Sequence, residues 1–225
     1  MGLTTALKLR EIGYEVHVFA KIVAGDGPCA LPGSVCSDDI VSSGAGAIWE
    51  YPPYKVEPAA AAKRWALDSL DYFQALAERG SEETGVHLRR THVLSRQRED
   101  PEDLEEMRTV LPHYHEYPPA DLPAHVGKHL TAGYAFEAPV VWMPKYLAYL
   151  RASCRKAEVH LHQGVHLPPS ILRDGSGLLR LLRAWLPGGS PEFPLVINCL
   201  GLANREISQD AAMTPVRRQR LSGSE

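Results

Sequence analysis

The sequence predicts an α/β protein with a parallel sheet, and two observations support this fold class. Residues 1–20 are typical of a helix, a glycine stop and a strand, which together make the second half of a βαβ unit. Residues 194–201 form an apolar run into a turn, as expected of a strand buried on both faces of a parallel sheet. The 225 residues, 44% of them hydrophobic, suffice for one large domain or two small ones.

The helix and strand expected in residues 1–20 are predicted by their local sequence patterns. Residues 1–10 have helical character without an N-cap before them, and Gly13 ends the helix. Residues 15–20 alternate polar and apolar side chains, which is typical of a strand. A unit of this order begins with a buried strand and a G-x-G-x-x-G turn. We therefore expect both to precede residue 1, with Gly2 as the last glycine of that turn.

Further elements alternate along the chain. Residues 21–41 predict a long loop, and residues 58–80 predict a helix with Trp65 and Phe73 at core positions. The acidic residues 99–107 predict a short solvated helix or loop. The elements expected after these are a strand at 134–143, a helix opened by Pro144 and ending at Lys156, a strand at 159–162, and a strand or helix at 178–186.

Composition narrows the class of partner. A net charge of -3 gives no basic stripe for nucleic acid or an anionic membrane surface, so a small molecule is expected. The four cysteines form no C-x-x-C pair and are expected as reduced thiols. No apolar run reaches the roughly 20 residues of a membrane span, and the N-terminus lacks a secretory signal pattern. We expect a cytoplasmic protein, or a peroxisomal one if a longer form carries a C-terminal signal.

A run of small residues before a Trp, at 42–49, is the strongest sign of a ligand site. Small side chains let the backbone approach a large planar or anionic ligand. The alternative interpretation is a flexible loop beside a structural Trp.

Four segments, taken in order, resemble the D-amino-acid oxidase and D-aspartate oxidase family of FAD-dependent oxidoreductases. They are residues 2–7, 45–49, 134–150 and 196–202. The resemblance implies a doubly wound FAD-binding sheet whose first strand is missing here, with part of an antiparallel substrate domain. It also implies a chain truncated at both ends.

The resemblance implies one incomplete FAD-dependent oxidoreductase domain over residues 1–225. Within it, residues 1–56 and 157–216 mainly form the FAD-binding part, and residues 57–156 mainly form the helical and substrate-side part. The residues implied to bind FAD are Gly2, Ser42, Ser43, Ala45, Gly46, Ala47, Ile48, Val165, Cys199 and Gly201. Ser42 and Ser43 would bond the pyrophosphate, and Val165 would lie near the adenine.

The implied reaction is oxidative deamination of a D-amino acid by FAD and oxygen, giving a 2-oxo acid, ammonia and hydrogen peroxide. The substrate arginine and its tyrosine helpers are expected beyond residue 225, so no catalytic residue is assigned. The resemblance leaves room for a homodimer. Alternatives are a related amine or glycine oxidase, and a truncated, non-catalytic product without flavin that acts through protein association.

Several residues have competing interpretations. His160 and His162 alternate as metal ligands might, as do His113 and His115. No carboxylate or cysteine is placed in sequence to complete either set, so solvated or capped histidines are preferred and no metal is assigned. Cys199 is expected as a small core residue rather than a nucleophile. Residues 20–22 offer no acid for a ribose, and the basic residues 217–220 are interpreted as a solvated tail rather than a phosphate site.

Overall fold

The computed structural model describes residues 1–25, 42, 47–51, 58–96, 101–122, 129–184, 195–201 and 204–205. The chain divides into two compact units, and each is described by itself below. The first comprises Met1–Val23 and Leu150–Glu225, and the second comprises Ala24–Tyr149. The predicted α/β class is confirmed, with one parallel and one antiparallel sheet. The functional domain ranges given above stay a prediction.

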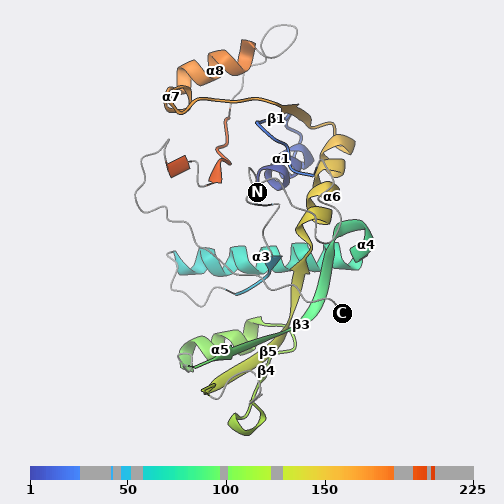
Figure 1. Ribbon diagram of the computed structural model, residues 1–225, viewed down its shortest axis with the longest axis vertical. Coiled ribbons are helices and arrows are strands. Elements are labelled where there is room, and N and C mark those ends of the chain that lie inside the picture. The colour runs from blue at the N-terminus through green and yellow to red at the C-terminus, as the bar shows by residue number, and fades with distance from the viewer. Residues whose placement is uncertain are drawn as a thin grey trace. The chain divides into compact units, whose positions relative to one another are not determined.

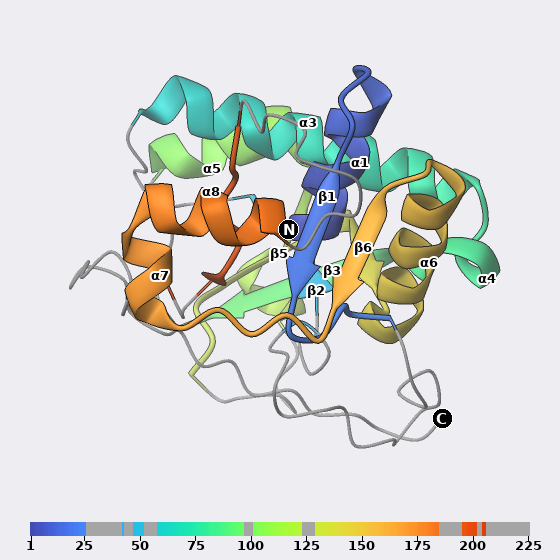
Figure 2. The ribbon, with the colours of Figure 1, turned by 90° about the horizontal axis from the view of Figure 1, so that it is seen from above.

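The first unit contains a parallel strand pair. Strands β1 (His17–Ala20) and β6 (His160–Gln163) lie side by side, as Figure 2 shows. Helix α1 (Gly2–Glu11) precedes β1 and ends before Gly13, whose φ of +95° favours glycine. The predicted helix, glycine stop and strand are therefore confirmed, as is the strand expected at 159–162.

Helices α6 (Met143–Lys156), α7 (Pro169–Arg173) and α8 (Gly175–Ala184) also contribute to the described part of the first unit. Helix α6 brings its C-terminal end into this unit, where Cys154 is fully buried and its thiol lies 3.6 Å from the Leu3 carbonyl oxygen. The helix predicted to begin at Pro144 is confirmed. Helices α7 and α8 follow β6. Residues 178–186 were expected to form either a strand or a helix, and α8 shows that residues 178–184 are helical.

The buried strand predicted at 194–201 is wrong. Residues 195–200 have no regular secondary structure and are exposed, with Leu195 58% accessible. An apolar run forms a strand only where neighbouring backbone takes up its N–H and C=O groups. Among the described residues, no strand pairs with this segment. Cys199 is exposed as well, so the expectation that it is a core residue is also wrong.

The second unit is built on an antiparallel sheet around β5 (Ala132–Val141). Strand β3 (Val86–Ser95) pairs with β5 along its whole length, and the short strands β2 (Ala47–Ile48) and β4 (His115–Glu116) also pair with β5. Figure 1 shows β3 and β5 as two long neighbouring ribbons, with α5 beside them. Strand β5 confirms the strand predicted at 134–143, whereas β2, β3 and β4 were not predicted.

Two helices complete the core of this unit. They are α3 (Ala59–Glu78) and α5 (Pro101–Val110). The buried core residues are Trp49, Tyr51, Ala66, Leu70, Met107, Leu111, Phe136 and Ala138. The helix predicted at 58–80 is confirmed. Of the two interpretations of residues 99–107, helix is correct, but α5 is not wholly solvated, because Met107 is 2% exposed. Phe73 packs against the core as predicted, whereas Trp65 is 56% exposed, so its assignment to the core is wrong.

A tight connection joins α3 to β3. It contains the short helix α4 (Ser81–Thr84), and Thr84 is fully buried, with its hydroxyl donating to the Leu76 carbonyl at 3.1 Å. The Val86 amide donates to the same hydroxyl oxygen at 3.2 Å. The remaining short element of the unit is the 3-10 helix η2 (Pro119–Asp121). Within the described part of the chain, no helix is long and apolar enough to cross a membrane.

Candidate functional site

The second unit contains an open groove between β2, α3 and the end of β5. Its volume is about 490 Å³, within the range of small-molecule sites. The lining residues are Ala47, Ile48, Trp49, Glu50, Ala62, Trp65, Ala66, Ser69, Phe73 and Val141. Among them Glu50 alone carries a charge, so the groove favours an apolar or planar ligand.

Trp49 forms a fixed part of the groove wall. Its indole N–H donates to the Ser69 hydroxyl at 3.0 Å, and that hydroxyl donates to the Ala66 carbonyl at 2.7 Å. The Trp49 amide donates to the Pro139 carbonyl at 2.9 Å, next to the ladder of β2 and β5. The indole is therefore held both from the sheet and from α3, and only 8% of Trp49 is exposed.

Trp65 and Ile48 leave apolar surface open at the groove. Ile48 is 46% exposed and Trp65 is 56% exposed. Single exposed apolar residues are common, but two large ones beside one hollow indicate a surface that a ligand or partner covers. Trp65, Ala66 and Ser69 share the groove side of α3 because residues three and four positions apart lie on one helix face.

A polar chain lies next to Trp49. Tyr51 donates to the Glu106 carboxylate at 2.9 Å, and Lys63 pairs with the same oxygen at 2.9 Å. Burial, followed by the effects of Glu106, raises the pKa of Tyr51 to about 12. Hydrogen bonds from Lys63 and then Tyr51 lower the pKa of Glu106. At neutral pH Tyr51 is therefore a neutral donor and Glu106 is an anion. The ion pair between Lys63 of α3 and Glu106 of α5 joins the two helices.

The structure brings some of the predicted cofactor residues together within each unit. In the second unit, Ala47 and Ile48 lie side by side in the groove, and Ser42 is half-buried. In the first unit, a Cβ added to Gly2 would lie 3.5 Å from the Cys199 Cβ. The predicted residues Ser43, Ala45 and Gly46 lie outside the described residues.

Val165 and Gly201 have backbone roles in the first unit. The Val165 amide donates to the Ala20 carbonyl at 3.0 Å, which prolongs the pairing of β1 with β6. Gly201 has a φ of +58°, a conformation that glycine adopts without strain. Helix α1 has no acidic residue in its first turn, so no carboxylate there opposes an anion near Gly2.

Sequence reasoning missed the contributions of Ser69 and Trp65 to the groove. The available signal was the spacing of Ala62, Trp65, Ala66 and Ser69 along one helix face. Such spacing identifies a face but does not tell whether another element covers it. Tyr51 and Glu106 were also missed, because no local pattern links residues 55 positions apart.

The chain belongs to the family of FAD dependent oxidoreductases, whose sequence pattern matches residues 1–222. Among individual relatives, it is 29% identical to a D-amino-acid oxidase of Streptomyces coelicolor over 97% of this chain. It is also 29% identical to a D-amino-acid oxidase of Rubrobacter xylanophilus over 98% of this chain. The chain spans 55% of the length of each of these relatives.

Two solved structures show weaker likeness. A glycine oxidase from Bacillus cereus has a TM-score of 0.45 at 15% identity, with 72% of this chain and 43% of that chain covered. The amino acid oxidase NikD has a TM-score of 0.40 at 20% identity, with 72% of this chain and 40% of that chain covered.

Proposed function

We propose that this chain takes part in the FAD-dependent oxidation of D-amino acids to 2-oxo acids, with release of ammonia and hydrogen peroxide. The observation that carries the proposal is the family match over residues 1–222, together with likeness to two D-amino-acid oxidases over nearly the whole chain. The partners proposed are a small D-amino acid and oxygen.

The residues of the groove fit a planar ring such as that of FAD. Ala47 has a small side chain, and Trp49 is held rigidly by Ser69, so the wall is formed before a ligand arrives. The exposed indole of Trp65 would gain cover from a bound ring. When bound, FAD would supply the acceptor for the hydride that leaves the substrate α-carbon.

The proposed cofactor contacts are those that the family resemblance implies. Ser42 and Ser43 would hydrogen-bond the pyrophosphate, and the backbone of residues 45–48 would run along the flavin ring. In the first unit, Gly2, Val165, Cys199 and Gly201 would line the nucleotide part. Half-buried Ser42 and the first turn of α1, which carries no acidic residue, support these assignments.

The apolar groove would do two things for the reaction. Its walls would exclude water from the ring, and the fixed indole of Trp49 would hold the ring in one orientation. Glu50 is the charged group of the lining and would face the rim rather than the ring, because it is exposed. No proton transfer by a residue of this chain is required by this proposal.

The test is release of peroxide by a full-length form of the protein loaded with FAD. Separate assays use D-alanine, D-aspartate and glycine, with L-alanine as the stereochemical control. We expect peroxide with at least one D-amino acid and none with L-alanine. A loaded chain that oxidises glycine alone would favour the related glycine oxidase activity. A folded, loaded chain without turnover on any D-amino acid would refute the proposed activity and favour the non-catalytic alternative.

A further inference from the structure

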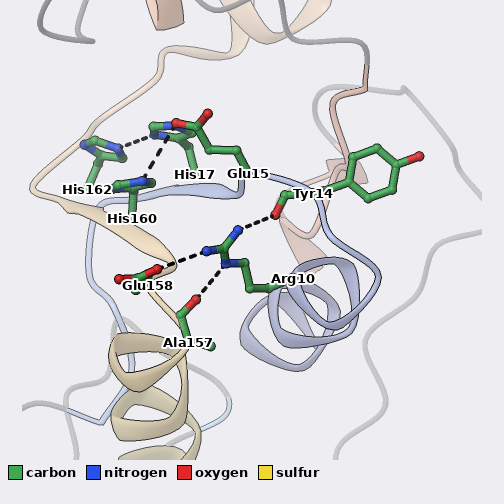
Figure 3. Close-up of polar contacts among 8 residues, drawn as sticks. All are labelled: Arg10, Tyr14, Glu15, His17, Ala157, Glu158, His160 and His162. Carbon is green, nitrogen blue, oxygen red and sulfur yellow. Dashed lines mark hydrogen bonds and ion pairs between the residues drawn. The ribbon is translucent and has the colours of Figure 1, made fainter.

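Four polar side chains gather on one face of the β1–β6 pair. Parallel pairing places His17 opposite His160, and the next residues on that face are Phe19 and His162. Glu15 lies two residues before His17, so the alternation of an extended chain directs it to the same face. Figure 3 shows the Glu15 carboxylate close to His17 and His160, whose rings are stacked with their centroids 4.5 Å apart.

Two imidazole nitrogens face the Glu15 carboxylate. The Nε2 atoms of His17 and His160 lie 3.1 Å and 3.8 Å from the same Glu15 oxygen, Oε1. Zinc binds nitrogen and oxygen at about 2.0–2.2 Å with tetrahedral angles, so its ligand atoms are about 3.3 Å apart. The two distances lie on either side of this separation, and the three candidate ligand atoms all lie within 4.8 Å of one another.

We propose that Glu15, His17 and His160 form a binding site for a divalent ion of the zinc class. Two histidines and one carboxylate are a ligand set that zinc proteins use, with water in the fourth position. Glu15 and His160 expose 64% and 51% of their side chains, so an ion and its water have access from solvent. His17 exposes only 9% and provides the fixed ligand.

His162 completes the site as a second-sphere partner. Its Nε2 lies 3.0 Å from His17 Nδ1, on the side of the ring that faces away from Glu15. Without metal, His17 Nε2–H donates to Glu15, because a carboxylate only accepts, and His162 then donates to His17 Nδ1. With metal at His17 Nε2, the His17 proton lies on Nδ1 and donates to His162. The two rings keep two protons in all, so this change needs no net proton release.

The guanidinium of Arg10, which lies near the site, does not pair with the Glu15 carboxylate. Arg10 of α1 donates to the Ala157 carbonyl at 2.8 Å and to Glu158 at 3.1 Å (Figure 3). The positive charge is therefore paired by Glu158, a carboxylate outside the site. Glu11 supplies a matched control, because it is an exposed glutamate of α1 in the same unit, paired with Lys8, and the proposal leaves it without a role.

The experiment uses the full chain after treatment with a chelator. Zn²⁺ is titrated in competition with a chromogenic chelator, and Co²⁺ is titrated separately by visible absorption. We expect one equivalent of Zn²⁺ to bind and Co²⁺ to give the intense visible bands of a tetrahedral site. Glu15→Gln and His160→Gln should each weaken Zn²⁺ binding more than His162→Gln, for which a second-sphere loss of about 10–100-fold is expected. Glu11→Gln should bind as the unaltered chain does.

Each variant is checked by far-UV circular dichroism before the titration. If folded Glu15→Gln and His160→Gln bind Zn²⁺ as tightly as the unaltered chain, the site is refuted. If the variants do not fold, the Co²⁺ spectrum of the unaltered chain decides, because absence of tetrahedral bands would refute the site. The outcome is independent of flavin binding and turnover, since no residue of the proposed cofactor site takes part.

Discussion

The indole N–H of Trp49 donates to the hydroxyl of Ser69 across 3.0 Å, and this bond joins the strand beside the groove to helix α3. Replacing Ser69 with alanine removes the acceptor and leaves a buried N–H without its partner. We expect Ser69→Ala to lower the free energy of unfolding by about 1–2 kcal/mol. Denaturant unfolding followed by Trp fluorescence measures this loss. Ser153→Ala, on α6, is the comparison, and an equal effect of the two changes would contradict the role of the bond.

Replacing Trp65 with alanine should weaken ligand binding while leaving the stability of the fold almost unchanged. Because its side chain is largely exposed, Trp65→Ala should change the free energy of unfolding by only about 0.5 kcal/mol. The same change removes one apolar wall of the groove, so the Kd for FAD should rise about 10-fold or more. Flavin fluorescence titration measures the affinity. A variant that loses stability but keeps its affinity would place Trp65 in the core and not in the site.

Gly85 tests the packing of α6 against the connection that precedes β3. Its φ is +73°, and an added Cβ would lie 2.9 Å from the Tyr146 amide nitrogen and 3.0 Å from the Trp142 carbonyl oxygen. Gly85→Ala should therefore destabilise by more than about 1 kcal/mol. Gly164→Ala is the matched control, because Gly164 has a similar φ of +78° with no atom within 4 Å of the added Cβ. Equal losses in thermal unfolding would show that the clash with α6 is absent.

Cys154 should make stability depend on alkaline pH. Burial raises the pKa of its thiol from the ordinary value of 9.0 to about 11, so the folded state favours the neutral thiol. The stability that this thiol contributes is complete below pH 9 and is lost as the pH rises toward 11.

Denaturant unfolding between pH 9 and 11 measures this effect of the thiol. Tyr51 acts in the same direction at higher pH, with a pKa of about 12, so Cys154→Ala isolates the thiol. The unaltered chain should lose more stability over this range than Cys154→Ala does. Identical slopes in the two chains would contradict a buried, neutral thiol.

Local patterns predicted the elements whose signals are carried by neighbouring residues. Alternation predicted β1 and β6, Gly13 marked the end of α1, and Pro144 marked the start of α6. Strand β3 escaped prediction because Arg89, Arg90 and other polar residues interrupt its apolar pattern. Its strand conformation depends on ten-residue pairing with β5, which no local signal reports.

The sites were predictable to different degrees. Ala47 and Ile48 were predicted from their small-residue context and do line a groove. Exposure of Trp65 could not be predicted, because helical spacing does not show whether a face is covered. The histidine pair at 160 and 162 was noticed in the sequence, but the pairing of β1 with β6 is needed to bring His17 to His162 across 145 positions.

Binding of FAD to the full chain tests the central claim most directly. The protein is equilibrated with excess FAD, freed of unbound ligand, and its visible flavin absorbance is measured beside Ala47→Val and the exposed control Ala60→Val. We expect about one flavin per chain, weaker binding by Ala47→Val because the added methyl groups crowd the ring, and no change with Ala60→Val. A folded chain that remains colourless, or that binds flavin equally well in all three forms, would contradict a cofactor site at this groove.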